Sequence, residues 1–179
     1  MRIVVYCSSR ERLDKKYQQL ARLLGTWIGQ NGHTLVYGGS NAGLMHITSA
    51  TVHKMGGHVV GVIPEIFKHR IDPVCDEVIH TRDLSERKQY MIKLGDIFIV
   101  LIGGIGTLDE WISTLTVMCI DKKATRPIIV ANLDGIFDSI INQLEILDDT
   151  PFARNQQVCQ SIIVKDVTEL LQTLETLTL

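Results

Sequence analysis

Short apolar runs alternate along this chain with longer segments in which apolar residues recur every three or four positions. The short runs have the length of buried strands, and the periodic segments have the length of helices. Strands are expected at residues 3–6, 34–37, 58–63, 77–80, 97–101, 127–131 and 162–164, and helices at residues 17–28, 44–55, 83–93, 108–120, 137–147 and 167–177. This alternation predicts βαβ units, and therefore an α/β fold with an open, mainly parallel sheet covered by helices on both faces.

The series of elements continues without a repeat or a low-complexity segment. Residues 65–76 show no clear period, and residues 148–160 are the one expected linker. A chain of 179 residues is long enough for one α/β domain and short for two. We therefore expect one domain over residues 1–179.

Composition and charge narrow the functional classes. The net charge is −2 and no basic run is interleaved with aromatic residues, which disfavours nucleic acid as a partner. No apolar stretch reaches the roughly 18 to 20 residues that a membrane span needs. The N-terminal apolar run is short and resembles a buried strand more than a signal peptide. These features favour a cytoplasmic protein that does not bind membranes.

Cysteine and histidine positions give no metal or disulfide pattern. The four cysteines, Cys7, Cys75, Cys119 and Cys159, are irregularly spaced and are expected to be reduced, buried thiols. The histidines show no spacing typical of metal ligands. We therefore expect neither a metal ion nor another cofactor.

Two glycine-rich turns follow expected strands, at Gly38–Gly43 and Gly103–Thr107. Ligands of parallel sheets bind beyond the carboxyl ends of the strands, where such turns gather. The first turn lacks the Lys-Ser/Thr pair of a P-loop, and Asp109 replaces the third glycine of a dinucleotide fingerprint in the second. The remaining interpretation is a monophosphate bound by the backbone N–H groups of Gly103–Thr107. Alternatively, the glycines only shape the turns.

Glu110 admits two interpretations from the residues alone. Thr107 and Glu110 fit a capping box, in which Thr107 begins the helix and Glu110 binds back to its N–H. On a helical wheel Glu110 lies nearly opposite the apolar face of Trp111 and Leu115, so a capping role is favoured over a catalytic one. At a helix N-terminus its carboxylate is expected to be ionised.

Arg87 and Lys88 occupy an unusual position on the preceding helix. Asp83 is a good N-cap for that helix, whose apolar stripe includes Leu84 and Met91. Both cations fall inside the stripe, although charged side chains normally face away from the core. Their position indicates an anionic ligand or a buried carboxylate.

Four stretches together resemble the LOG (Lonely Guy) family, whose members are Rossmann-like proteins long mislabelled as lysine decarboxylases. They are YGGSNAGLM, ERKQYM, GDIFIVLIGGIGTLDE and ANLDGIFD. The family pattern P-G-G-x-G-T-x-x-E is matched at five positions, and its upstream Arg-Lys pair is matched by Arg87 and Lys88. Two positions differ: Ile102 replaces the proline, and His46 stands where a glycine usually follows Leu-Met.

The resemblance implies hydrolysis of the N-glycosidic bond of AMP or of N6-substituted cytokinin nucleotides, releasing free base and ribose 5-phosphate. It also implies a homodimer or a larger assembly. Arg87 and Glu110 would be catalytic, with Glu110 acting as a base or as an electrostatic stabiliser of an oxocarbenium-like ribose. The nucleotide would be bound by Gly39, Ser40, Gly43, Lys88, Gly103, Gly104, Gly106 and Thr107. The alternative is a protein that binds a nucleotide or phosphorylated cofactor without hydrolysing it.

Overall fold

The computed structural model describes residues 1–121, 125–151 and 161–178. Seven strands form one sheet in the order β4-β3-β2-β1-β5-β6-β7, and every neighbouring pair is parallel. The predicted α/β architecture is therefore confirmed. The strands are β1 (Arg2–Tyr6), β2 (Thr34–Tyr37), β3 (His58–Pro64), β4 (Glu77–Thr81), β5 (Ile97–Val100), β6 (Ile128–Ala131) and β7 (Ser161–Val164).

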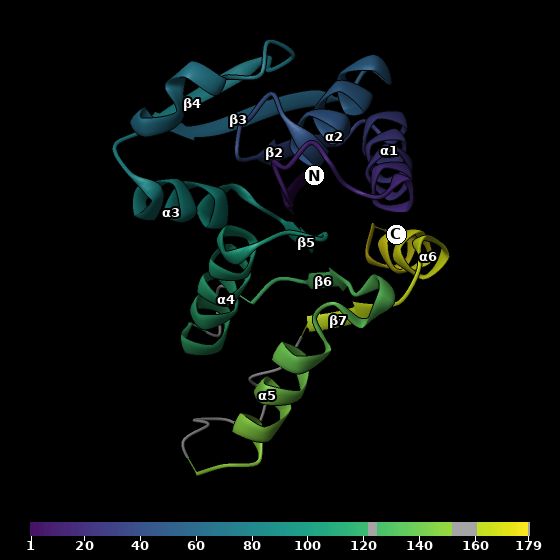
Figure 1. The fold of residues 1–179 in the computed structure, drawn as a ribbon, viewed down its shortest axis with the longest axis vertical. Coiled ribbons are helices and arrows are strands. Elements are labelled where there is room, and N and C mark those ends of the chain that lie inside the picture. The colour runs from purple at the N-terminus through teal and green to yellow at the C-terminus, as the bar shows by residue number, and fades with distance from the viewer. Residues whose placement is uncertain (122–124, 152–160, 179) are drawn as a thin grey trace.

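Helices cover both faces of the sheet (Figure 1). α1, α2 and α6 lie on one face, and α3 and α4 lie on the other, while α5 extends away beyond the β7 edge. The helices are α1 (Lys15–Gln30), α2 (Gly43–Lys54), α3 (Leu84–Leu94), α4 (Ile105–Ile120), α5 (Asp138–Asp148) and α6 (Val167–Thr178). Two 3₁₀ segments, η1 (Glu65–Arg70) and η3 (Leu133–Gly135), complete the described elements.

The sheet separates two hydrophobic clusters, and β1 contributes to both. Ile3 and Val5 pack into the cluster under α1, α2 and α6, whereas Val4 and Tyr6 pack into the cluster under α3 and α4. Successive side chains of a strand point to opposite faces, so a strand buried on both sides is apolar throughout. This is why the central strands appear in the sequence as continuous apolar runs.

The expected elements are all present, with one difference that matters for the site. Helix α4 begins at Ile105, three residues before the expected start at Leu108, and extended Gly104 is its N-cap. Most of the expected linker, residues 152–160, lies outside the described residues. Residues 65–70, expected to be irregular, form η1.

The cysteines that the structure describes fit the prediction only in part. Cys7, Cys75 and Cys119 form no disulfide, but only Cys7 is buried. Cys75 is partly exposed, and its Sγ lies 3.3 Å from Tyr37 Oη at the end of β2. Cys159 lies outside the described residues.

The described residues contain neither a membrane-spanning helix nor a cluster of metal-binding side chains. None of their helices combines the length and apolar character needed to cross a bilayer. Within the same residues, no three His, Cys, Asp or Glu side chains are grouped so that they could hold a metal ion.

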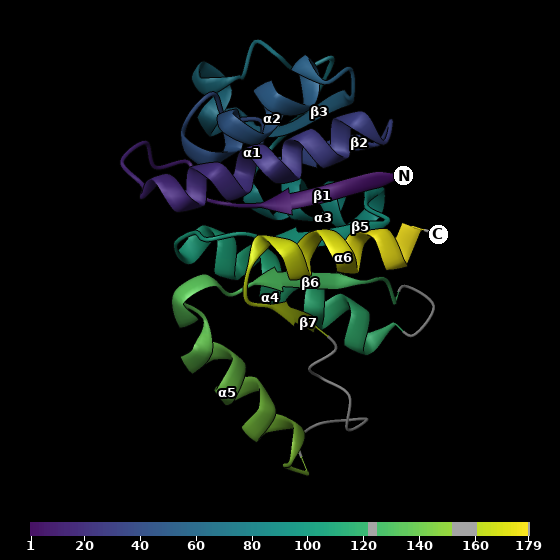
Figure 2. The ribbon, with the colours of Figure 1, turned by 90° about the vertical axis from the view of Figure 1, so that its right-hand side faces the viewer.

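The strand order changes direction at β1, in the centre of the sheet: β2, β3 and β4 are added on one side of it, and β5, β6 and β7 on the other. β1 pairs with β2 on one side and with β5 on the other. The turns after β1, β2 and β5 therefore meet at the carboxyl edge of the sheet, which lies on the left in Figure 2. Such a switch point is where open α/β sheets bind ligands. The prediction that both glycine-rich turns share one edge is confirmed.

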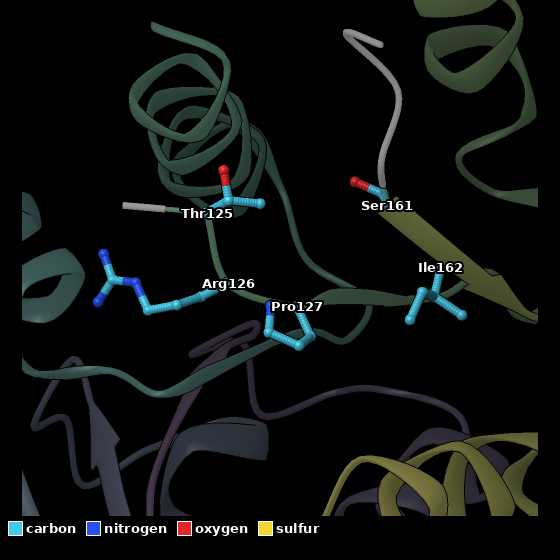
Figure 3. A pocket seen from close by; sticks show the side chains of 5 residues that line it. All are labelled: Thr125, Arg126, Pro127, Ser161 and Ile162. Carbon is cyan, nitrogen blue, oxygen red and sulfur yellow. The ribbon is translucent and has the colours of Figure 1, made fainter. Parts of the chain in front are cut away.

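A pocket of about 390 Å³ lies at the opposite edge of the sheet (Figure 3). Thr125, Arg126, Pro127, Ser161 and Ile162 line it, where β6 and β7 begin. The guanidinium of Arg126 donates to the backbone carbonyl of Ile92 at 2.7 Å and also binds the carbonyl of Gly95. This arginine thus joins the end of α3 to the start of β6, away from the glycine-rich turns.

Candidate active site

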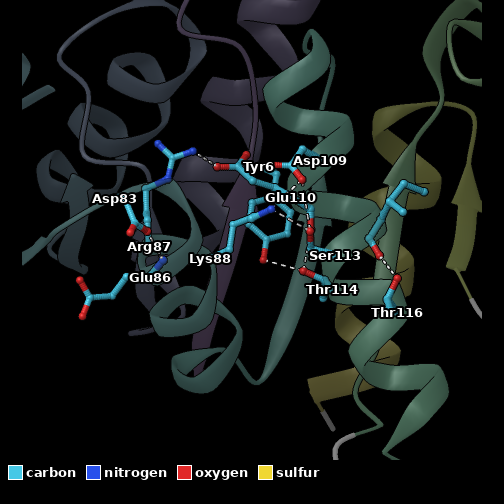
Figure 4. Close-up of polar contacts among 11 residues, drawn as sticks. Tyr6, Asp83, Glu86, Arg87, Lys88, Asp109, Glu110, Ser113, Thr114 and Thr116 are labelled. Carbon is cyan, nitrogen blue, oxygen red and sulfur yellow. Dashed lines mark hydrogen bonds and ion pairs between the residues drawn. The ribbon is translucent and has the colours of Figure 1, made fainter. Parts of the chain in front are cut away.

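An ion pair between a mostly buried arginine and a buried glutamate joins α3 to α4 at the carboxyl edge of the sheet. Arg87 Nη2 donates to Glu110 Oε1 at 2.5 Å (Figure 4). The side chains are only 11% and 2% exposed. The predicted N-cap, Asp83, accepts from the Glu86 N–H at 2.8 Å and so begins the helical turn that carries Arg87. Of the two partners expected for a cation inside the apolar stripe, an anionic ligand or a buried carboxylate, Arg87 contacts a buried carboxylate.

Glu110 is not a cap, and it does not face outward. Because α4 begins at Ile105, Glu110 lies in the second turn of the helix, and the Gly104 N-cap has no side chain to form a capping box. The buried residues of α4 are Thr107, Glu110, Trp111, Thr114, Leu115 and Met118, which recur at helical spacing. The expected capping role and the expected outward-facing position of Glu110 were both wrong. The sheet and α3 bury a wider face of α4 than the face that its apolar residues occupy.

The prediction that the Glu110 carboxylate is favoured in its ionised form is also wrong, because the pKa of this group is raised. Burial raises the pKa of Glu110 to about 7, and the neighbouring Arg87 guanidinium opposes this rise. The helix dipole acts mainly within the first turn, and Glu110 lies beyond it. Glu110 is therefore a carboxyl group that changes its charge near neutral pH, as catalytic carboxyls often do.

The guanidinium of Arg87 also reaches the first glycine-rich turn. A Cβ atom on Gly38 would lie 3.5 Å from Arg87 Nη1 and 3.1 Å from Met45 Cε. Arg87 Nε is buried and has no hydrogen-bond partner among the described residues. Arg87 thus lies between the turn after β2 and the carboxylate on α4, with donor capacity left for a ligand. Gly38 was missing from the predicted site, although its doublet with Gly39 signalled a close approach of side chains to the backbone.

Lys88 points away from this pair. Its Nζ donates to Asp109 Oδ1 at 2.6 Å and to Ser113 Oγ at 3.0 Å on the outer side of α4. Asp109 is half exposed, so this ion pair lies at the rim of the site. The structure therefore brings Arg87 and Glu110 together but leaves Lys88 bound to a different carboxylate.

Tyr6, at the end of β1, holds the turn of α4 that carries Glu110. Thr114 Oγ1 donates to the Glu110 carbonyl at 2.8 Å, so the 2.8 Å contact between Tyr6 Oη and Thr114 Oγ1 has the tyrosine as donor. Burial raises the pKa of Tyr6, which keeps this donor protonated. Tyr6 was missing from the predicted site, because a hydroxyl at the carboxyl end of a buried strand was the one sign of its role that the sequence carried.

The second glycine-rich turn contains two kinds of glycine. A Cβ on Gly103 would lie 2.0 Å from Thr107 Oγ1, so Gly103 is required by the packing of the buried Thr107 side chain. A Cβ on Gly104 or Gly106 would meet nothing within 4 Å, and neither residue has a positive φ. The fold itself does not need these two glycines. Their open surface at the start of α4 suits a ligand that approaches the backbone closely.

We expect Gly106→Ala to raise the stability of the fold and to lower the affinity for AMP. Alanine is the better helix former, so the free energy of unfolding should rise by about 0.5–1 kcal/mol. The added methyl group should weaken AMP binding by about tenfold or more if a phosphate lies on the N–H groups at the helix start. Urea denaturation and calorimetric titration measure the two effects. Thr116→Ala, on the exposed side of α4, is the control and should leave AMP binding unchanged. Unchanged AMP affinity in Gly106→Ala would contradict a phosphate at this position.

The first glycine-rich turn presents one free hydroxyl. Gly39 and Gly43 have positive φ values of 71° and 61°, which explains glycine at both positions. A Cβ on Gly43 would also lie 2.5 Å from the Arg10 carbonyl oxygen in the loop after β1. Ser40 Oγ is buried and unpartnered among the described residues. Gly39 and Gly43 therefore shape the turn, and Ser40 is the residue that offers a side-chain group.

Comparison with known proteins identifies the family of this chain. The family model described as "Possible lysine decarboxylase" matches residues 45–174. The chain is 39% identical over 150 residues to the cytokinin riboside 5′-monophosphate phosphoribohydrolase LOG of Oryza sativa subsp. japonica, covering 81% of this chain and 60% of the rice protein. It is 34% identical over 180 residues to LOG7 of Arabidopsis thaliana, which bears the same enzyme name, covering 97% and 81% of the two chains. This chain belongs to the LOG family.

A solved structure shows the same fold at lower sequence identity. The molybdenum cofactor carrier protein of Chlamydomonas reinhardtii superposes with a TM-score of 0.76 at 21% identity, covering 99% of this chain and 97% of that one. The rice LOG protein is longer, and the chain spans 60% of its length. Membership of the LOG family therefore rests on the sequence relatives, and the structural neighbour supports the fold alone.

The two departures from the LOG pattern are accommodated locally. His46 Nδ1 lies 3.0 Å from the buried carboxylate of Asp72, which also accepts a 2.7 Å bond from Ser49 Oγ. The imidazole is thereby held against the segment after η1. Ile102 packs against the core cluster under α1 and α2, and its carbonyl accepts from the Ser8 N–H at 3.0 Å. A backbone contact with the loop after β1 fixes the entrance of the second turn without proline.

Proposed function

We propose that this chain hydrolyses the N-glycosidic bond of AMP or of N6-substituted adenosine 5′-monophosphates, releasing free base and ribose 5-phosphate. The observation that carries the proposal is the buried Arg87–Glu110 pair beside a glycine-rich turn at the switch point of the sheet. The relatives named cytokinin riboside 5′-monophosphate phosphoribohydrolase support the same reaction. Few folds would bury such a pair for stability alone, because its desolvation cost is high.

The phosphate of the substrate would lie at the start of α4. Backbone N–H groups at a helix N-terminus favour an anion, and Gly104 and Gly106 leave the space above them open. Thr107 is buried against Gly103 and fixes the shape of this turn. Anchoring the phosphate there would orient the ribose relative to Glu110 one turn further along the helix, which is a large part of what such enzymes contribute.

Glu110 would act on the ribose as the glycosidic bond breaks. Loss of the base leaves positive charge on C1′ and the ring oxygen, and a carboxylate nearby stabilises this charge or takes a proton from attacking water. Arg87 would hold the carboxylate in its ionised form and would bind the substrate through its Nε–H, which has no partner among the described residues. Tyr6 would act only through Thr114 by fixing the helical turn, and is thus a positioning residue.

The raised pKa of Glu110 predicts the pH dependence of the reaction. The carboxylate form exists above the pKa, so kcat/KM should be high above about pH 7 and fall as the pH decreases through that value. Below it the fall should approach about tenfold per pH unit, as expected for one essential ionised group. Initial rates of base release from AMP between pH 5 and 9 test this. A flat profile, or a rate that rises on acidification, would contradict the role of the ionised carboxylate.

The substrate panel tests the proposed reaction and its base preference. Purified protein would be incubated with AMP, N6-isopentenyl-AMP, GMP and CMP, and the free base separated by chromatography. Release of adenine or N6-isopentenyladenine in preference to guanine and cytosine is the expected result. Absence of any free base would contradict the proposed function.

The second candidate is binding of a nucleotide or phosphorylated cofactor without hydrolysis. It needs both glycine-rich turns but not a titrating carboxyl at position 110. The name of the Chlamydomonas reinhardtii carrier shows that a protein of this fold serves such a role. Tight AMP binding together with complete recovery of intact AMP would favour this candidate.

We also propose that the chain is cytoplasmic and acts as a homodimer, as the resemblance to the LOG family implies. Because Glu110 is already buried within one chain, a partner is not needed to cover it. Light scattering at the protein concentration of the activity assay tests the assembly. A mass near 40 kDa, twice the chain's 20.1 kDa, is expected, and a mass of one chain would contradict the dimer.

A further inference from the structure

A second cleft opens at the carboxyl edge of the sheet, on the side of α1 and α2. Its volume is about 720 Å³. Three segments form its walls: the loop between β1 and α1, the turn before α2, and the end of η1. The lining residues are Ser9, Arg10, Glu11, Arg12, Leu13, Asn41, Ala42 and Arg70. None of these residues belongs to the Arg87–Glu110 pair or to the turn at Gly103–Thr107.

The cleft concentrates positive charge in a chain whose net charge is −2. Arg10, Arg12 and Arg70 all line it, and among the described residues Glu11 is the one acidic residue of its lining. None of the three arginines forms an ion pair within the part of the chain that the structure describes. Arg82, by contrast, is an exposed arginine that pairs with a nearby glutamate. Three unpaired guanidinium groups around one hollow repel one another unless an anion lies between them.

Backbone hydrogen bonds hold the three walls together. The Leu44 N–H donates to the Ser8 carbonyl at 2.9 Å, which ties α2 to the loop after β1. The Asn41 N–H donates to the Arg70 carbonyl at 3.0 Å, which ties the turn before α2 to the end of η1. The arginines therefore extend from a fixed frame. The N-terminus of α2, which has no side-chain cap, lies at the same place and adds to the positive potential.

The same turn connects this cleft with the candidate active site. Gly38 approaches the guanidinium of Arg87, and Asn41 lines the cleft only three residues later. Three extended residues span at most about 10 Å. The buried hydroxyl of Ser40, which has no hydrogen-bond partner in the part of the chain that the structure describes, lies on this stretch. One extended ligand, or two smaller ligands, could therefore occupy neighbouring parts of a single edge of the sheet.

We propose that this cleft binds an oligophosphate group. Guanidinium groups bind phosphate oxygens through paired N–H donors, and three of them match several linked phosphates better than one. The group is either a free oligophosphate or the phosphate chain of a nucleotide. This site goes beyond the proposed hydrolysis of a monophosphate and does not depend on it.

Calorimetric titration of the whole protein with sodium tripolyphosphate in metal-free buffer tests the proposal. Arg12→Ser/Arg70→Ser removes two of the three guanidinium groups, both on exposed side chains. Tripolyphosphate should bind the unmodified protein, and its affinity for this double variant should be lower by about tenfold or more. Arg22→Ser, an exposed arginine on α1 outside the cleft, is the matched control and should bind like the unmodified protein. Circular dichroism checks that each variant is folded.

Titrations with AMP and ATP distinguish the two sources of the oligophosphate. Tighter binding of ATP than of AMP, with the difference lost in the double variant, supports a nucleotide whose phosphates extend into the cleft. Simultaneous binding of AMP and tripolyphosphate supports a free oligophosphate. Equal affinity of the double variant and the Arg22→Ser control for tripolyphosphate, or no binding to any form, would overturn the proposal. Because these titrations measure binding alone, a protein that releases no base could still show the site.

Discussion

Glu110→Gln is expected to lower the rate of base release from AMP by about 10²- to 10⁴-fold while AMP binding stays measurable. Glutamine keeps the size of the side chain and still accepts a hydrogen bond from Arg87, but it cannot carry the charge that stabilises the ribose. The loss should therefore appear in kcat more than in the affinity for AMP. Chromatographic rates and calorimetric titration measure the two quantities.

The control for this variant is a substitution that removes a different, exposed carboxylate. Glu175→Gln lies on the exposed side of α6 and should leave both quantities unchanged. If Glu110→Gln turned over AMP at a rate close to that of the unmodified protein, Glu110 would have a structural role only.

Arg87→Met is expected to destabilise the fold in a pH-dependent way. The substitution leaves Glu110 buried without its partner, and breaking such a pair costs about 3 to 5 kcal/mol. Without Arg87, the one neighbour that most strongly lowers the pKa of Glu110 is lost, so this pKa should rise above about 7. The carboxyl is then neutral at pH 5.5 and is forced toward its charged form at pH 8. The loss of stability should therefore be larger at pH 8.

Urea denaturation at the two pH values measures this effect. The double variant Arg87→Met/Glu110→Gln has no charge at either position and should lose the pH dependence. Equal destabilisation of Arg87→Met at pH 5.5 and pH 8 would show that lost packing, and not an unpaired carboxylate, causes the effect.

Base release should also fall by about 10²-fold or more in Arg87→Met, because the carboxylate is no longer held ionised.

The alternation of apolar runs and periodic segments was enough to predict the sheet and its helices. Strands such as β1 and β5 are buried on both faces, so their apolar runs are unbroken and easy to locate. The start of α4 was harder to predict because Gly104 is the cap. Glycine has no side chain with which to mark a helix start, whereas Thr107 offered a false capping signal.

The candidate site could be predicted in part from single anomalies. Arg87 was informative because a cation inside an apolar stripe needs a partner, and that partner proved to be Glu110. The burial of Glu110 could not be predicted, because it depends on how widely α3 and the sheet cover α4. The role of Tyr6 depends on a contact across 108 positions of the chain, which no local pattern encodes.

The product balance of the reaction with AMP tests the proposed cleavage of the N-glycosidic bond most directly. We would quantify adenine, ribose 5-phosphate, adenosine and inorganic phosphate after incubation with the unmodified protein. We expect equimolar adenine and ribose 5-phosphate, with neither adenosine nor phosphate formed. Intact AMP, or adenosine together with phosphate, would contradict the assignment of the Arg87–Glu110 pair to cleavage of the N-glycosidic bond.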